Sequence, residues 1–290
     1  MEYHVSQLAH RHSLEYEVEN SMAALVYVSM LYDHCLERGK SVIGGGARYR
    51  GGIIESFGIV NAADSLTAIK ELVYDKKQMT LEQLVNILDC NYEGFERERK
   101  LVLGAPKFGN DNPEADAMVQ WVSDHVCTVT QQQAPKFGLD YFLIVNINNY
   151  YNVELGKITA ASADGRYRGA PLANGNTPTA GMDKNGITAF LNSLSKVSPE
   201  KHAGYSHNMK FSKQMFSKER KKLEILMDTY FARGGTQAML TVVNCGDLEN
   251  AMKEPEKYPN LIVRVGGFSA RFIELSKEVQ QDVLNRTLYE

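Results

Sequence analysis

The chain contains few of the residues that build disulfide frameworks or cysteine-rich metal sites. Its 290 residues include four cysteines, and no two of them form a Cys-x-x-Cys pair. Scattered cysteines argue against a disulfide scaffold and against a structural zinc site, so we identify no metal site and no bound cofactor. Reduced thiols fit a cytoplasmic location, which we expect for this protein.

The chain also lacks a marked excess of positive or negative residues and has no long apolar run. Lysine and arginine total 32 against 35 aspartates and glutamates, which gives a net charge of −3. No basic block is present, so nothing in the charge pattern indicates nucleic-acid binding. The N-terminus does not show the charged stretch followed by an apolar stretch that is typical of a signal peptide. No apolar run approaches the length of a membrane span. Hydrophobic residues make up 43%, enough for a substantial core.

Apolar periodicity predicts a mostly helical chain with a few strands. Apolar residues recur at helical spacing over about 15–38, and Gly39 is placed to end that helix. Thr80 and Gln83 fit a capping box for the helix that follows. Further helices are expected at about 62–74, 81–89, 113–130, 217–233, 246–253 and from Ser276, and strands at about 142–145, 205–211 and 237–243.

Residues 156–186 are loop-like and rich in glycine, proline, asparagine and aspartate. A long irregular stretch is unusual in a compact domain and is more often functional or docked against a partner. We place a domain boundary near residue 160, which divides the chain into residues 1–160 and 161–290.

The most informative segment is Arg264-Val265-Gly266-Gly267-Phe268-Ser269-Ala270-Arg271-Phe272. Two adjacent glycines interrupt an apolar strand here, although glycine is costly within a strand. Glycine suits a sharp turn or a backbone that another group must approach closely. A tight turn between two strands is therefore one interpretation of this segment.

The same segment resembles the C-terminal signature of the glycyl radical enzymes, a family similar to pyruvate formate-lyase. The resemblance implies that Gly267, the glycine before Phe268, carries an organic radical. It implies supporting roles in the radical loop for Arg264, Gly266, Phe268, Ser269 and Arg271. A radical centred on Cα is delocalised over the flanking amides when Cα is planar, and glycine has no side chain to crowd that geometry.

Earlier segments extend the resemblance over most of the chain. Residues 162–166, 169–175 and 183–189 resemble the family's loops ahead of the radical glycine, and residues 44–49 are similar to its glycine-rich stretch after a long helix. Each of these segments alone is also explained by ordinary turn chemistry. For Arg166 and Arg168, solvated turn arginines are favoured over bidentate binding of an anionic substrate.

Family members also use a cysteine that takes the radical from glycine and attacks the substrate as a thiyl. The resemblance places that cysteine farther upstream of the glycine than this chain extends, so the chain is expected to begin after the cysteine loop. Its own cysteines lack that loop's context, and buried structural thiols are favoured for all of them: Cys35, Cys90, Cys127 and Cys245.

The resemblance implies an α/β fold, the second half of a ten-stranded barrel with a C-terminal glycine radical domain. The function it implies is that of a radical-bearing subunit or fragment of a lyase or dehydratase of anaerobic metabolism. Its partners would be a cysteine-bearing half and a radical S-adenosylmethionine activating enzyme. Two alternatives remain: a replacement part that restores the radical to an oxygen-damaged lyase, and an inactive truncated product.

Overall fold

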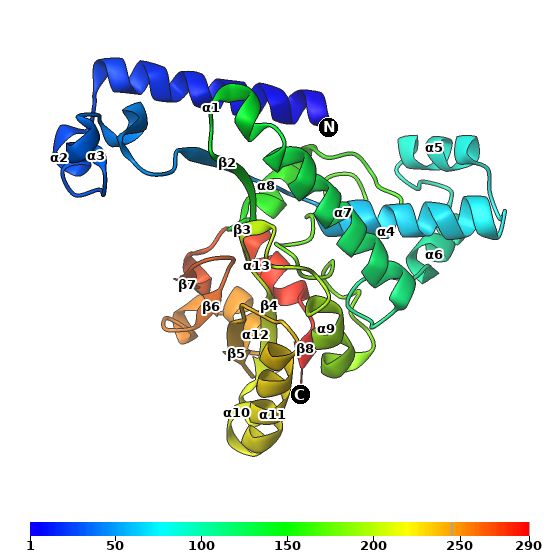
Figure 1. Cartoon of the computed structure of the whole chain (residues 1–290). Helices are drawn as coiled ribbons and strands as arrows, with labels where there is room; N and C mark the ends of the chain where they lie inside the picture. Colours follow the sequence, from blue (N-terminus) through cyan, green and yellow to red (C-terminus); the bar gives the residue numbers. More distant parts are fainter. Residues whose placement is uncertain (245, 290) are drawn as a thin grey trace. The chain divides into compact units, whose positions relative to one another are not determined.

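The computed structural model describes residues 1–244 and 246–289. The chain is mixed α/β and forms two compact units (Figure 1). The first contains residues 1–55, 124–145 and 200–203, and the second contains residues 56–123, 146–199 and 204–290. The predicted boundary at residue 160 concerns domains of the family rather than these spatial units, and it stays a prediction. No described helix is both long and apolar enough to cross a membrane.

The first unit begins with three helices: α1 (Glu2–Met22), α2 (Val26–Ser29) and α3 (Cys35–Arg38). The prediction of one helix over 15–38 is therefore wrong. Leu25 and His34 adopt left-handed backbone conformations with φ of 44° and 69°, which a continuous helix cannot include. No proline or glycine marks the break after Met22, so the apolar spacing on either side gave no warning of it.

A small sheet follows the π-type turn η1 (Val42–Gly46), and most of its residues belong to the first unit. Strand β1 (Gly51–Glu55) pairs in parallel with β2 (Tyr141–Asn146), which contains the predicted strand at 142–145. The sheet order is β1-β2-β3, with β3 at His202–Tyr205. The 3-10 turn η3 (Ala134–Phe137) precedes β2. Phe142 is fully buried in a cluster with Val5, Ala9, Ala134 and Leu139.

Helices dominate the early part of the second unit. Helix α4 (Ile59–Ile69) continues into η2 (Lys70–Asp75), and α5 (Leu81–Asp89) and α6 (Glu96–Gly104) follow. Helix α7 (Pro113–Gln131) comes next, and its residues from 124 onward belong to the first unit. The predicted capping box is confirmed, because the Thr80 hydroxyl accepts from the Gln83 amide while the Gln83 side chain accepts from the Thr80 amide. Helix α6 was missed, because its charged sequence has little apolar periodicity.

The rest of the second unit contains the glycine pair. The loop predicted at 156–186 is confirmed for residues 159–185, which form neither helix nor strand, whereas residues 156–158 belong to a helix and Gly186 begins another. Strand β4 is buried at every position and lies between β5 and β8, parallel to both. Figure 1 shows this sheet together with the hairpin of β6 and β7 and with α13. The elements are α8 (Tyr151–Ile158), α9 (Gly186–Leu194), β4 (Asn208–Ser212), α10 (Lys213–Ser217), α11 (Arg220–Ala232), β5 (Met239–Val243), α12 (Asp247–Lys253), η4 (Pro255–Lys257), β6 (Ile262–Arg264), β7 (Ser269–Arg271), η5 (Phe272–Glu274), α13 (Lys277–Asn285) and β8 (Leu288–Tyr289).

A carboxyl group is buried in the helical part of the second unit. Asp64, on α4, is fully buried, and its Oδ1 accepts a hydrogen bond of 2.9 Å from the backbone amide of Phe108. Burial raises the pKa of Asp64 to about 7, although that hydrogen bond and nearby Lys107 oppose the shift. The folded chain therefore holds a proton here that the unfolded chain releases near pH 4.

Replacing Asp64 with asparagine tests how much the burial of this carboxyl group lowers stability at neutral and higher pH. Because the pKa is raised in the folded state, wild-type stability is greatest below the unfolded pKa of 3.8 and falls as the pH rises toward about 7. Asp64→Asn keeps an acceptor for Phe108 and carries no charge. Urea unfolding should show the variant more stable than wild type at pH 8 by roughly 1–3 kcal/mol, with a smaller difference at pH 4. A difference that does not change between the two pH values contradicts this assignment, and the exposed Asp89→Asn is the control.

Candidate functional site

The glycine pair forms the tip of a tight β-hairpin. Strands β6 and β7 pair antiparallel, with Arg264 opposite Ser269, and the Val265 amide donates to the Phe268 carbonyl at 3.0 Å. Gly266 and Gly267 are therefore the two loop residues of the hairpin. The tight turn inferred from the sequence is confirmed, and it coincides with the segment that resembles the radical signature.

Gly267 has a backbone conformation that only glycine adopts readily. Its φ is +99°, and a Cβ atom built on it would lie 2.8 Å from Ile147 Cγ2 and 2.9 Å from Asn149 Oδ1. The residue itself is exposed, whereas Gly266 is buried, and a Cβ there would lie 2.6 Å from the Asn149 carbonyl oxygen. Both positions exclude a side chain, but the Cα of Gly267 also has an open face.

Arg286, which follows α13, holds the base of this loop. Its guanidinium donates to the Arg264 carbonyl at 2.9 Å and to the Val265 carbonyl at 2.8 Å. The same guanidinium pairs with Asp282 at 2.9 Å, and both side chains are largely buried. A planar guanidinium can reach several acceptors in fixed directions, so this contact sets the position of the hairpin relative to α13.

The residues expected to support the loop lie around the hairpin in different ways. Arg264 donates across the hairpin to the Ser269 hydroxyl at 2.8 Å, and its backbone amide donates to Thr241 Oγ1 on β5. Phe268 and Ser269 are exposed. Arg271 pairs with Glu274 at 3.3 Å on the surface, away from the two glycines. Supporting roles in radical chemistry stay predictions for these residues.

Buried asparagines support the other side of the loop. Asn174 Nδ2 donates to the Asn149 carbonyl and to Asn152 Oδ1, and Asn174 Oδ1 accepts from Asn208. Asn148 accepts from the Gly175 amide. A carboxamide both donates and accepts, so a chain of asparagines can satisfy the irregular backbone beneath the loop.

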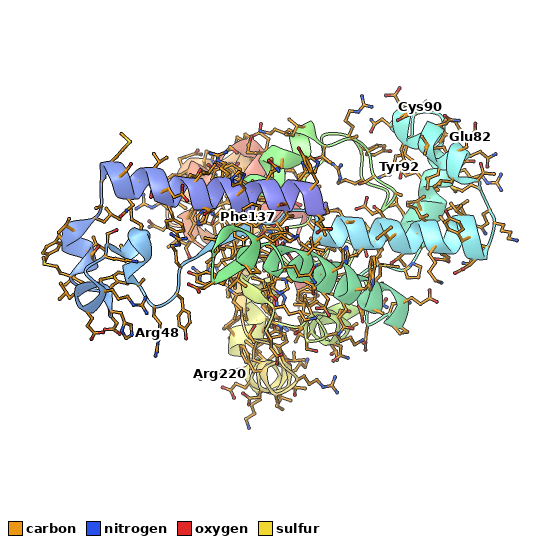
Figure 2. The ribbon with its side chains drawn as sticks, turned by 45° about the horizontal axis from the view of Figure 1, so that its top comes forward. Arg48, Glu82, Cys90, Tyr92, Phe137 and Arg220 are labelled. Carbon is orange, nitrogen blue, oxygen red and sulfur yellow. The ribbon has the colours of Figure 1, made fainter. Side chains whose placement is uncertain are left out.

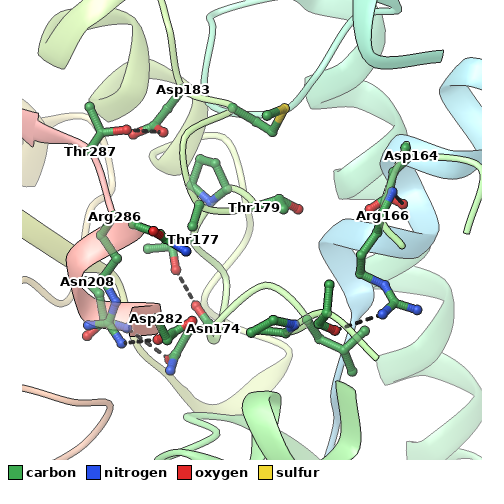
Figure 3. Close-up of a pocket in the computed structure, with 18 of the residues that line it drawn as sticks. Asp164, Arg166, Asn174, Thr177, Thr179, Asp183, Asn208, Asp282, Arg286 and Thr287 are labelled. Carbon is green, nitrogen blue, oxygen red and sulfur yellow. Dashed lines mark hydrogen bonds and ion pairs between the residues drawn. The ribbon is translucent and has the colours of Figure 1, made fainter. Parts of the chain in front are cut away.

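A cavity of about 330 Å³ lies beside this network, and Figure 3 shows its labelled residues. Asp183 accepts from Thr287 at 2.5 Å and also from Tyr289, and burial raises the pKa of Asp183. The charged side chains labelled in Figure 3 all have partners within the protein. These side chains are therefore already engaged in contacts within the protein, and we assign the cavity no catalytic role.

Arg166 is neither a solvated turn arginine nor an arginine that is free to bind an anionic substrate, the two interpretations considered from the sequence. It is 6% exposed, and its guanidinium donates to the carbonyls of Tyr167, Ala170 and Ala160 and to the Ser162 hydroxyl. It is thus a buried arginine that folds the loop around itself. Arg168 donates from the surface to the Asp89 carbonyl, which fits a turn arginine.

The cysteines differ from one another more than the sequence indicated. Cys35 and Cys127 are buried, and burial raises the pKa of Cys127 to about 11, which disfavours its reactive thiolate. Cys90 follows α5 and is exposed, so the expectation of a buried thiol is wrong there (Figure 2). Its position at the end of an amphipathic helix gave no indication of which side it faces. Cys245 lies outside the described residues.

Comparison with known proteins connects this geometry with a family. Residues 1–152 match the family model described as pyruvate formate lyase-like, and residues 172–273 match the model described as glycine radical. The hairpin lies within the second match. The chain belongs to the glycyl radical enzyme family.

Relatives within the glycyl radical enzyme family include a trans-4-hydroxy-L-proline dehydratase from Clostridioides difficile, 34% identical over 90% of this chain and 33% of the relative. An isethionate sulfite-lyase from Bilophila wadsworthia is 32% identical over 88% of this chain and 31% of its own length. The solved structure of a B12-independent glycerol dehydratase from Clostridium butyricum matches with a TM-score of 0.92 and 33% identity, covering all of this chain and 37% of that one. The chain thus spans about a third of the length of the curated relatives that it matches.

Sequence reasoning missed the residues that fix the loop from a distance. Arg286, Asn149 and Met239 contact the hairpin, but they lie 19, 118 and 28 positions from Gly267. No spacing rule links them to a glycine pair. The one available signal was for Asn149, since an Asn-Asn pair after a buried strand is typical of a left-handed turn.

Replacing Arg286 by lysine tests its hold on the hairpin. Lysine keeps the charge but cannot reach the two carbonyls and Asp282 with one planar group. We expect Arg286→Lys to lower the free energy of unfolding by roughly 1–3 kcal/mol and to speed amide exchange in residues 264–270. Arg271→Lys, at an exposed pair, is the control and should change stability by less than about 0.5 kcal/mol. Equal effects of the two variants on stability and exchange contradict the assignment.

Proposed function

We propose that this chain is the radical-bearing part of a glycyl radical lyase or dehydratase, with the unpaired electron on Cα of Gly267. The observation that carries the proposal is the hairpin tip. Gly267 is exposed, has a conformation that favours glycine, and lies within the segment matched as a glycine radical domain. Neighbouring Gly266 is buried, which favours Gly267 as the carrier.

The chemistry requires an external hydrogen acceptor. A radical S-adenosylmethionine activating enzyme would supply a carbon radical that takes one hydrogen atom from Gly267 Cα, and the unpaired electron remains on glycine. Delocalisation into the flanking amides stabilises the product. The contacts of Arg286 with the Arg264 and Val265 carbonyls keep the base of the loop in place while its tip reacts.

Turnover would require a second component that provides the thiyl-forming cysteine. None of the described cysteines lies on the hairpin, and Cys127 is a poor thiolate. The two small sheets, each with parallel strand pairs, fit the half-barrel implied by the family. Apolar side chains exposed on α1, α2 and α3 support a large covering partner: they include Leu8, Leu14, Val18, Met22, Val26 and Leu36.

The family match over residues 1–152 favours this assignment over a replacement part made of the radical domain alone. The dehydratases and sulfite-lyases among the relatives favour elimination from a small substrate as the reaction class.

Electron paramagnetic resonance tests the proposal. After anaerobic activation with S-adenosylmethionine, an activating enzyme and a one-electron reductant, the chain should give a doublet from the single Cα hydrogen of a glycyl radical. Growth on α-deuterated glycine should collapse the doublet without changing the protein's structure, and Gly267→Ala should abolish it.

A matched control separates radical chemistry from backbone strain. Gly234 has a φ of +102°, close to that of Gly267, and lies in the turn between α11 and β5. Gly234→Ala imposes similar backbone strain outside the hairpin and should keep the doublet. A full signal in Gly267→Ala, or a signal unaffected by deuterated glycine, would refute the assignment.

A further inference from the structure

The amide of Gly267 has a sulfur acceptor. The backbone nitrogen of Gly267 donates to Sδ of Met239, on β5, at 3.3 Å. Met239 is 2% exposed, and its side chain lies on the buried face of the strand. This contact joins the radical-bearing residue directly to the sheet, and no motif in the hairpin accounts for it.

Thr241, the next residue on the same face of β5, also accepts a backbone hydrogen bond from the hairpin. Thr241 Oγ1 accepts from the backbone amide of Arg264 at 2.9 Å. Residues two apart on a strand share a face, so Met239 and Thr241 present two side-chain acceptors in a row to the hairpin. Strand β5 thus holds β6 and the loop through side chains.

We propose that Met239 is a positioning residue for the glycyl radical: its thioether holds the Gly267 amide and raises the electron density that the amide nitrogen donates into Cα. This inference rests on the proposed function of Gly267. A hydrogen-bond acceptor on the N–H group draws the proton away from nitrogen, which strengthens the donation of the nitrogen lone pair. The stabilisation is small, because sulfur is a weak acceptor.

A thioether suits this position for two further reasons. Loss of a hydrogen atom flattens the Gly267 Cα, so the amide must move, and the flexible methionine side chain can follow it. Methionine sulfur also carries no hydrogen. A serine, threonine or cysteine acceptor would place an O–H or S–H group beside the radical, and an S–H group could return a hydrogen atom to it.

The first experiment measures the hydrogen bond without activation. In a chain labelled with 15N-glycine, amide exchange at Gly267 should accelerate by roughly twofold to tenfold in Met239→Leu, since leucine has similar bulk and no acceptor. Met239→Gln, which restores an acceptor at similar length, should recover most of the protection. Met215→Leu, another buried methionine outside β5, is the control and should leave Gly267 exchange unchanged.

The second experiment measures the radical. After activation, Met239→Leu should shorten the anaerobic lifetime of the doublet by a similar factor and alter its 15N hyperfine coupling, while Met239→Gln and Met215→Leu remain close to wild type. If Met239→Leu does not fold, the wild-type chain is instead labelled with selenomethionine enriched in 77Se. The expected result is then a hyperfine coupling between 77Se and the radical.

The outcomes are distinguishable. Unchanged Gly267 exchange in a folded Met239→Leu refutes the hydrogen bond. Faster exchange with an unchanged lifetime and coupling, or no 77Se coupling, refutes the role in the radical. No doublet in activated wild type refutes the proposed function, and with it this role, whatever the exchange shows.

Discussion

The contact between Arg286 and the carbonyls of Arg264 and Val265 is the constraint on which the rest of the site depends. It ties the end of α13 to the strand that leads into the glycine pair, and Asp282 fixes the guanidinium in turn. Because these groups are largely buried, loss of any one leaves the others without partners in a medium of low polarity. The base of the hairpin is therefore held by buried, charge-assisted hydrogen bonds.

The tip combines two requirements that glycine meets together. The two-residue loop needs a positive φ, and a radical needs a Cα that can become planar without a side chain against it. Ile147 and Asn149 occupy the face where a side chain would lie. Asn174 donates to the Asn149 carbonyl and also to the side chain of Asn152. The asparagines thus replace regular secondary structure in satisfying the backbone where the chain is too irregular to pair with itself.

Local features were predictable from the sequence, and distant contacts were not. The Thr80 capping box, the helix opened by Pro113 and the turn at Gly266-Gly267 depend on neighbouring residues, and each was found. The break after Met22 was not predicted, because Leu25 adopts a left-handed conformation within a sequence that has regular helical spacing of apolar residues. Arg166 was misjudged, since its acceptors are backbone carbonyls whose positions exist only after the loop has folded. Arg286 and Met239 have no local signal, although they contact the glycine hairpin directly.

The mass of the activated chain after exposure to air tests most directly whether Gly267 carries a radical. Oxygen adds rapidly to a carbon-centred radical, and the resulting peroxyl decomposes with backbone scission at that residue. Scission of the N–Cα bond of Gly267 in activated protein should therefore release residues 268–290 as a fragment that carries the oxidised two-carbon remnant of Gly267, while unactivated protein stays intact. Scission at Gly266 would differ by the mass of one glycine residue. Identical masses with and without activation, after a radical has been confirmed by its doublet, would contradict the account.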